Sequence, residues 1–364
     1  MKKIIYCISL LIIFSAAVLH AEGFDTVKVE AESIADADKS VSDYLTDHFP
    51  ILPDFMIEKI LKNKAVEITE KSEGESAATF FRIKYLIPQN FLLDTMKILW
   101  ELNIPEFRSH LFQIYENDTL YIDTWNNVVG TAKDKTYTGR FEAYRVRNWP
   151  SWKDPEPGKE DLPATPPGPK NPLGLFVVHY DENSLRYFHG TNKEHLLDDE
   201  NRSLSHGCVR NYNDNIARMK EFLIKRVIKS ADLSSWLDSK RSMTFDFDSS
   251  DRFPVRIIYK TFSVDKDESG YYVELYRDIY NYSNPRNINI KWNEADLITL
   301  TTEENLKGEI KSKTGNMYDD AKIDEIVDAI LNKYYRNSYC TRSTRTPFSE
   351  YPIWREVVPI QYVA

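Results

Sequence analysis

Prolines are concentrated in one short part of the chain, and this concentration constrains the fold more than any other feature of the sequence. Of the 17 prolines among 364 residues, eight fall between positions 150 and 172. Proline lacks a backbone N–H and fixes φ, so this segment can be neither a central strand nor a helix. It must form an extended loop, and such a long loop inside a compact domain is often functional. Trp149 and Trp152 are expected either to line a cleft or only to hold the loop in place.

Strand-like sequence lies on both sides of this loop. Residues 107–146 alternate between apolar and polar side chains and are rich in β-branched and aromatic residues. Within them, residues 111–122 are typical of a hairpin with a polar turn. Residues 253–283 predict further strands. Helical spacing occurs in three other segments, residues 92–102, 213–223 and 319–335. The sequence therefore predicts an α+β chain whose middle part is rich in strands.

Two short motifs in the middle of the chain carry a histidine and a cysteine. The first is His189-Gly190-Thr191 and the second is Ser205-His206-Gly207-Cys208-Val209-Arg210. A thiol becomes a nucleophile when a neighbouring base or positive dipole draws off its proton. Gly207 allows a tight turn that presents bare N–H groups to a developing oxyanion. Together these motifs favour a site for cysteine acyl transfer.

The pair of motifs resembles the L,D-transpeptidase family, the YkuD domain, in which HG[T/S] precedes [S/T]HGC. Further matches lie at residues 136–141, 162–163, 168–175, 254–259 and 272–276, so that the resemblance covers residues 104–283. It implies an α+β fold: a β-rich, sandwich-like YkuD catalytic domain with the cysteine at a strand-to-helix junction. A helical N-terminal region would precede this domain, and an α+β C-terminal extension would follow it.

The resemblance also implies catalytic roles. Cys208 would be the nucleophile and His189 the general base and acid, with the backbone carbonyl of Gly190 orienting the ring of His189. His206 would either support the pocket or be purely structural. These roles match those of a catalytic triad, in which a third group orients the base.

The remaining motif residues are expected to surround the substrate. The N–H groups of Gly207 and Cys208 would form the oxyanion hole. Arg210 would hold a substrate carboxylate, because its guanidinium presents a fork suited to that group, or would form an internal salt bridge. Ser205, which shapes the turn, and Thr191 would also lie beside the substrate.

The activity implied by the resemblance is acyl transfer on peptidoglycan. Cys208 would form a thioester with the third residue of a stem peptide and release D-Ala; an amine of another stem, or of a wall-anchored protein's lysine, would resolve it. Water as acceptor would make the protein an L,D-carboxypeptidase or hydrolase, and a non-catalytic wall-binding protein is a third interpretation. No cofactor is expected, since a thiolate and a histidine complete acyl transfer unaided. No metal is expected either, because His189, His195, His206 and Cys208 lack the paired short spacings of zinc sites.

The beginning of the chain predicts export. Residues 1–21 combine Lys2 and Lys3 with an apolar run, as in a secretory signal. We therefore expect the protein in the periplasm or cell envelope, with membrane contact only if the signal stays uncleaved. Cys7 would leave with the signal, and a disulfide between Cys208 and Cys340 would disable the thiol. A net charge of −9 and the lack of a basic stripe argue against nucleic-acid binding.

Four regions follow from these patterns. Residues 1–21 are the signal peptide, and 22–103 are a lead-in and a small helical region, with a LysM-like wall-binding module as the alternative. Residues 104–230 are the L,D-transpeptidase catalytic domain. Residues 231–364 are a C-terminal extension, in which 253–283 resemble the family's downstream strands.

Overall fold

The structure is a computed structural model that describes residues 11–13, 24–73, 76–93, 97–115, 118–154, 158–159, 161–228, 239–267, 270–335 and 355–360. The predicted signal, apart from Leu11–Ile13, lies outside the described residues, as do Cys7 and Cys340. The chain divides into two compact units, which are Met1–Ile98, Gln113–Tyr121 and Ala217–Lys240 for the first and Leu99–Phe112, Ile122–Ile216 and Arg241–Ala364 for the second. None of the helices that the structure describes is both long and apolar enough to cross a membrane.

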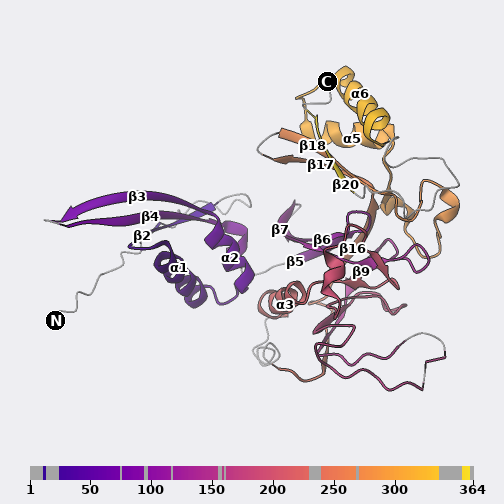
Figure 1. The fold of residues 1–364 in the computed structure, drawn as a ribbon, viewed down its shortest axis with the longest axis horizontal. Coiled ribbons are helices and arrows are strands. Elements are labelled where there is room, and N and C mark those ends of the chain that lie inside the picture. Colours follow the sequence, from indigo (N-terminus) through magenta and orange to yellow (C-terminus); the bar gives the residue numbers. More distant parts are fainter. Residues whose placement is uncertain are drawn as a thin grey trace. The chain divides into compact units, whose positions relative to one another are not determined.

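In the first unit, two helices accompany a sheet (Figure 1). Its elements are β1 (Leu11–Ile13), β2 (Phe24–Ala31), α1 (Ile34–His48), α2 (Asp54–Lys62), β3 (Lys64–Glu73), β4 (Ser76–Pro88) and the 3-10 turn Gln89–Leu92, with the strand order β1-β2-β4-β3. Alternate residues of the central strands, such as Val27, Val29, Ile83 and Tyr85, are buried. The region predicted to be helical thus also contains a sheet, because this period-2 alternation predicts strands.

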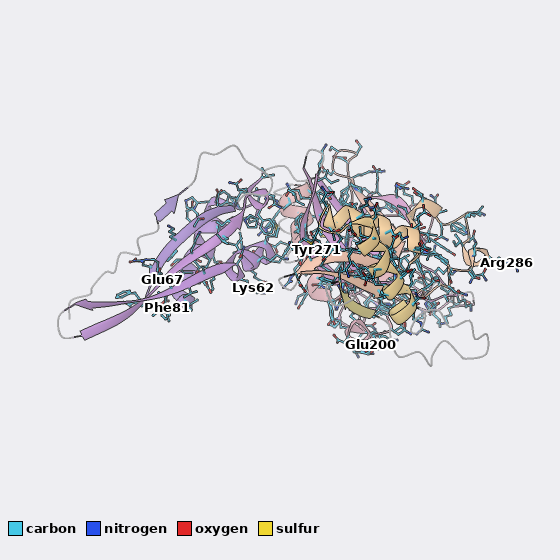
Figure 2. The ribbon with its side chains drawn as sticks, turned by 90° about the horizontal axis from the view of Figure 1, so that it is seen from above. Lys62, Glu67, Phe81, Glu200, Tyr271 and Arg286 are labelled. Atoms are coloured by element: carbon cyan, nitrogen blue, oxygen red, sulfur yellow. The ribbon has the colours of Figure 1, made fainter. Side chains whose placement is uncertain are left out.

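β3 and β4 form a long antiparallel ribbon. They pair from Lys64↔Tyr85 to Glu73↔Ser76, and Figure 2 shows Glu67 and Phe81 on these two strands. Ile68 on β3 is 67% exposed. The side chain of Ile68 therefore contributes little buried area at this point of the ribbon.

The strands around the predicted site belong to the second unit, except for the parts of β5, β6 and β7 that fall within residues 97–98 and 113–121. One sheet has the order β14-β12-β11-β10-β15, and another has the order β19-β16-β5-β6-β7, with β9 paired to β16. Their bounds are β5 (Lys97–Asn103), β6 (Arg108–Tyr115), β7 (Asp118–Asn126), β9 (Gly139–Ala143), β10 (Arg145–Asn148), β11 (Phe176–His179), β12 (Tyr187–His189), β14 (Val209–Arg210), β15 (Met243–Asp246), β16 (Phe253–Lys260) and β19 (Ile298–Thr299). A short pair, β8 (Val129–Gly130) and β13 (Ser203–Ser205), runs parallel. The α+β fold class and the predicted hairpin are confirmed.

One sequence prediction of a helix is wrong. The apolar spacing of Leu92, Met96, Leu99 and Leu102 predicts a helix, but Lys97–Asn103 is strand β5. This strand lies between β16 and β6 and is buried on both faces. A strand with two buried faces loses the polar alternation that identifies strands, so its pattern can imitate that of a helix.

The C-terminal part of the second unit has a core of its own. It consists of β17 (Phe262–Asp267), β18 (Gly270–Tyr276), α5 (Glu303–Thr314), α6 (Asp320–Ala329), a π-helical turn (Ile330–Tyr335) and β20 (Arg355–Pro359). Apolar residues of the strands, such as Val273, pack with Leu306 of α5 and Ile326 of α6, and Tyr271, labelled in Figure 2, packs against this cluster. The helix predicted over 319–335 is confirmed.

His179 on β11 gives the fold a dependence on pH. Its ring is buried between the rings of Tyr144 and Tyr187, and burial, with Arg147 and Arg145 nearby, lowers the pKa of His179 to about 4. An unfolded chain binds this proton with an ordinary pKa near 6.5, so protonation favours unfolding. The stabilisation is complete above pH 6.5 and is lost as the pH falls through 4.

We therefore expect the free energy of unfolding to fall by on the order of 2–3 kcal/mol between pH 7 and pH 4 through His179 alone. Urea unfolding at both pH values measures this difference. His179→Phe should reduce the difference, because a phenyl ring does not titrate. An equal pH dependence in His179→Phe and the parent protein would contradict the assignment.

Candidate active site

The two motifs meet at neighbouring strands of one sheet. β12 ends at His189, β14 begins directly after Cys208, and the two strands are parallel with His189 opposite Arg210. A cavity of about 920 Å³ opens there. Its lining includes His189, Thr191, Ser205, His206, Cys208 and Arg210. The structure thus brings these six residues, which the sequence predicted to act together, around one space.

His189 is buried with a fixed tautomer. Its Nδ1 donates a hydrogen bond to the carbonyl of Gly190 at 2.5 Å, the contact predicted from the sequence. Burial and the neighbouring Arg210 lower the pKa of His189 to about 3, against the opposing effect of the carbonyls of Gly190 and Leu173. The ring is therefore neutral at rest, with its proton on Nδ1 and a lone pair on Nε2.

Cys208 is half-buried and carries its proton at rest. Its Sγ donates to the carbonyl of Leu185 at 3.1 Å, and within the described part of the chain the structure records no hydrogen bond between Sγ and His189. Burial raises the pKa of the Cys208 thiol, although the Tyr187 N–H and the cations Arg186 and Arg210 oppose this shift. A neutral thiol and a neutral imidazole therefore face one cavity.

The turn before Cys208 depends on Ser205 and Gly207. Gly207 has φ +102, and a Cβ built on it would lie 2.8 Å from Nε of Arg186 and 3.1 Å from the carbonyl of Lys135. The Gly207 N–H donates to Ser205 Oγ at 3.1 Å, while that hydroxyl donates to the Cys208 carbonyl at 2.5 Å. The Gly207 N–H, predicted to bind an oxyanion, is therefore already engaged, and the hydroxyl of Ser205 is used within the turn.

Cys208 does not lie directly before a helix. β14 intervenes, and α3 (Asn213–Phe222) begins only after it. The expectation of a strand-to-helix junction at the cysteine is therefore wrong, although the predicted helix itself is confirmed. The helix dipole acts mainly within the first turn, so it contributes little at Cys208.

Asn213, the first residue of the segment predicted to be helical, fixes the loop after His189. Its Nδ2 donates to the Thr191 carbonyl at 2.8 Å and its Oδ1 accepts from the Thr191 N–H at 3.3 Å. A Cβ on Gly174 or on Gly190 would lie within 2.4 Å of this Oδ1. The two glycines thus make room for the amide that holds the Gly190–Thr191 backbone beside His189.

Cationic side chains outnumber acidic ones around the cavity. Arg147, Lys153, Lys193 and Arg210 line it, whereas Asp134 and Asp154 are the acidic residues of its lining. Asp154 is paired with Lys159 at 2.8 Å. Within the described residues no ion pair is recorded for the Arg210 guanidinium, so the alternative of an internal salt bridge is not seen there. The cavity therefore suits an anionic ligand.

The proline-rich loop contributes one of its two tryptophans to this cavity. Trp152 lies in the lining, and its backbone exchanges hydrogen bonds with Thr165 at 3.0 and 2.7 Å. Trp149 does not line the cavity, and its backbone φ is 42°. Of the two tryptophans expected either to line a cleft or only to hold the loop, Trp152 thus borders the cavity and Trp149 does not.

β12 and the two residues before it include side chains that the sequence did not single out. Leu185 and Tyr187 line the cavity, and Arg186 lies against the cysteine turn with its guanidinium 4.5 Å from the Tyr137 ring centre. The sequence feature that could have identified these three residues is their position just before the histidine motif. Among the described residues no group of three His, Cys, Asp or Glu side chains is placed to hold a metal ion.

Comparison with known proteins was made with this geometry in hand. No curated protein is significantly similar in sequence. Among solved structures, an L,D-transpeptidase from Mycobacterium smegmatis is 11% identical, covering 69% of this chain and 99% of its own, with a TM-score of 0.26. The helical cell shape determining protein Pgp2 from Campylobacter jejuni is 13% identical, covering 46% of this chain and 49% of its own, with a TM-score of 0.25. Likenesses at this level bear on neither activity nor substrate.

A sequence model of one family does match. It is that of YkuD, the L,D-transpeptidase catalytic domain, and it covers residues 102–228, which include both motifs and the strands that carry them. Residues 102–228 of this chain are therefore similar to the L,D-transpeptidase catalytic domains of the YkuD family.

Proposed function

We propose that this protein is a peptidoglycan L,D-transpeptidase with Cys208 as nucleophile and His189 as general base and acid. The observation that carries the proposal is a neutral His189, with a lone pair on Nε2, in the lining of the cavity that also contains the Cys208 thiol. A base must be unprotonated to accept a proton, and burial keeps this ring so. Gly190 acts through its carbonyl as the group that orients the base.

The reaction proceeds in two acyl transfers. His189 takes the thiol proton, and the Cys208 sulfur attacks the carbonyl of the third stem residue, so that a C–S bond forms. The C–N bond to D-Ala then breaks, and the amine leaves with a proton from His189. An amine of a second stem, or of a lysine in a wall-anchored protein, attacks the thioester and restores the thiol. Water in that place would instead give an L,D-carboxypeptidase or hydrolase.

The Cys208 N–H is the oxyanion donor in this scheme. The structure records no acceptor for it among the described residues, whereas the Gly207 N–H is bonded to Ser205. A free N–H aimed at the developing oxyanion stabilises the transition state more than the ground state. His206, which is exposed and lines the cavity, supports the substrate rather than the sulfur, and Thr191 is also part of the lining.

Arg210 binds a carboxylate of the stem peptide. Its guanidinium faces the cavity from β14, directly after the nucleophile, and stem peptides are rich in carboxylates. Export to the periplasm or cell envelope, as residues 1–21 indicate, would bring the protein to this substrate. Thiol and imidazole suffice for the chemistry, so the proposal includes no cofactor.

Replacing Arg210 by alanine should lower kcat/KM for a stem peptide with free carboxylates by about 10- to 100-fold, the usual worth of a hydrogen bond to a charged group. Steady-state D-Ala release measures this loss. The matched control is a peptide in which the carboxylates are amidated: the parent protein should lose activity on it, and the variant should lose little more. An equal loss by both proteins on the amidated peptide would contradict a carboxylate contact.

The whole proposal is tested by intact-protein mass spectrometry during incubation with a disaccharide-tetrapeptide. A transient mass gain with release of D-Ala is expected, and the final products show whether an amine or water resolves the thioester. Absence of both adduct and turnover with several stem peptides would favour a non-catalytic wall-binding protein.

A further inference from the structure

The peptide between Gly207 and Cys208 is held by hydrogen bonds on both sides. Thr136 Oγ1 donates to the Gly207 carbonyl at 2.9 Å, and Ser205 binds the groups before and after it, the Gly207 N–H and the Cys208 carbonyl. The Cys208 N–H follows the Gly207 carbonyl along the chain. Among the described residues, no acceptor is recorded for this N–H.

Thr136 therefore sets the direction of that N–H. The carbonyl of Gly207 and the N–H of Cys208 belong to one peptide unit, and in a trans peptide they point in opposite directions. A hydroxyl that holds the carbonyl on one side turns the N–H to the other side. At a glycine with φ +102 the backbone has more freedom than elsewhere, so the hydroxyl is needed to fix one orientation.

Thr136 is itself held by Tyr280. The phenol oxygen accepts from the Thr136 N–H at 3.1 Å and donates to the Gly130 carbonyl at 2.8 Å, while the Gly130 N–H donates to Thr136 Oγ1 at 3.0 Å. One buried phenol thus closes the 130–136 loop at both ends. Tyr280 follows β18 and lies outside the matched residues 102–228.

Tyr280 is also anchored on its own side. Its N–H donates to the hydroxyl of Tyr259 at 2.9 Å, and that hydroxyl donates to Asp278 at 2.5 Å. The tyrosine is 2% exposed. The position of Tyr280 is therefore fixed by β16 and by the segment after β18. Through its hydrogen bond to Thr136, Tyr280 in turn restrains the cysteine turn.

We propose that Thr136 and Tyr280 are positioning residues that aim the Cys208 N–H at the oxyanion. Neither needs to touch the substrate: Thr136 acts on the Gly207–Cys208 peptide, and Tyr280 acts on Thr136. The inference rests on the proposed acyl transfer at Cys208, but it holds for any acyl donor that passes through a tetrahedral intermediate. It gives the C-terminal extension a part in the chemistry.

The test compares two reactions of the Cys208 thiol in the purified full chain. With p-nitrophenyl acetate, the sulfur attacks the ester carbonyl, a C–S bond forms, and p-nitrophenolate leaves after a tetrahedral oxyanion. With iodoacetamide, the sulfur displaces iodide and no oxyanion forms. Adducts are assigned to Cys208 by peptide mass spectrometry. The ratio of the two rates reports the oxyanion site apart from the reactivity of the thiol.

Thr136→Val should lower acetylation about 100-fold, the usual cost of one oxyanion donor, and Tyr280→Phe about tenfold, the cost of a modest displacement. Alkylation should be unchanged in both. Thr136→Ser keeps the hydroxyl and should restore acetylation. Tyr282→Phe is the matched control, because Tyr282 is in the same segment but its hydroxyl bonds to Asn293 instead.

The inference would be overturned if Tyr280→Phe lost both reactions in parallel, or if it lost no acetylation. It would also be overturned if the ratio of acetylation rate to alkylation rate were no higher for Cys208 in the parent protein than for free cysteine. If Thr136→Val does not fold, Tyr280→Phe and Thr136→Ser still decide. Because neither probe resembles peptidoglycan, a selective loss of acetylation would stand even if the disaccharide-tetrapeptide proved not to be a substrate.

Discussion

Alanine in place of Cys208 is expected to abolish the acyl-enzyme and to slow D-Ala release from a disaccharide-tetrapeptide by about 10⁴-fold or more, the scale seen when a covalent nucleophile is removed. Ser205, the hydroxyl of the same motif, is not placed to replace the sulfur, since it is buried with its hydroxyl bonded to the Cys208 carbonyl. Intact-protein mass spectrometry and a D-Ala assay measure the two effects.

Cys208→Ser is the matched variant for this prediction. It keeps an atom that can donate to the Leu185 carbonyl, as the thiol does, but a hydroxyl is a far weaker nucleophile than a thiol near neutral pH. It should therefore keep the parent stability and substrate affinity while losing turnover. Normal D-Ala release by Cys208→Ala would rule out the sulfur as nucleophile.

Replacing His189 by glutamine is expected to lower kcat/KM by about 10²- to 10⁴-fold, the usual contribution of a general base. The amide retains a donor for the Gly190 carbonyl, so the loop should keep its shape while the base is lost. Steady-state kinetics with the tetrapeptide substrate give the loss, and alkylation of Cys208 by iodoacetamide shows whether the thiol also becomes less reactive.

The pH dependence of the parent protein supplies an independent check on His189. Burial lowers the pKa of His189 to about 3 and raises that of Cys208, so the productive pair of neutral groups persists between these values. We therefore expect kcat/KM to be level from about pH 5 to pH 8, because a profile of kcat/KM reports the free protein's groups. An acid limb centred near 6.5, where an ordinary histidine titrates, would contradict the assignment.

The site was largely predictable because its chemistry is local in sequence. His189, Cys208 and Arg210 lie in two short motifs, and both motifs line one cavity. Strand β5 was not predictable in the same way: it is buried on both faces, so its apolar residues carry no alternation to distinguish it from a helix. The predicted fold class rests on the sequence patterns of many segments, so the wrong assignment of β5 did not change it.

The contacts of the cysteine turn were beyond sequence patterns for another reason. Thr136 and Tyr280 are each far from Cys208 along the chain, and their role depends on hydrogen bonds that only the folded chain creates. The engagement of the Gly207 N–H by Ser205 is equally invisible in the motif, which shows two bare N–H groups where the folded turn leaves one.

The hydrogen bond from the Cys208 thiol to the Leu185 carbonyl bears on the survival of the protein as well as on its reaction. Sulfenic acid and mixed disulfides form from the thiolate, so a sulfur that retains its proton is oxidised slowly. If the protein is exported, as residues 1–21 predict, such a sulfur would outlast a permanently ionised one in oxidising surroundings. The resting geometry thus lowers the reactivity of the thiol but protects it from oxidation, and the thiol is deprotonated only when an acyl donor is bound.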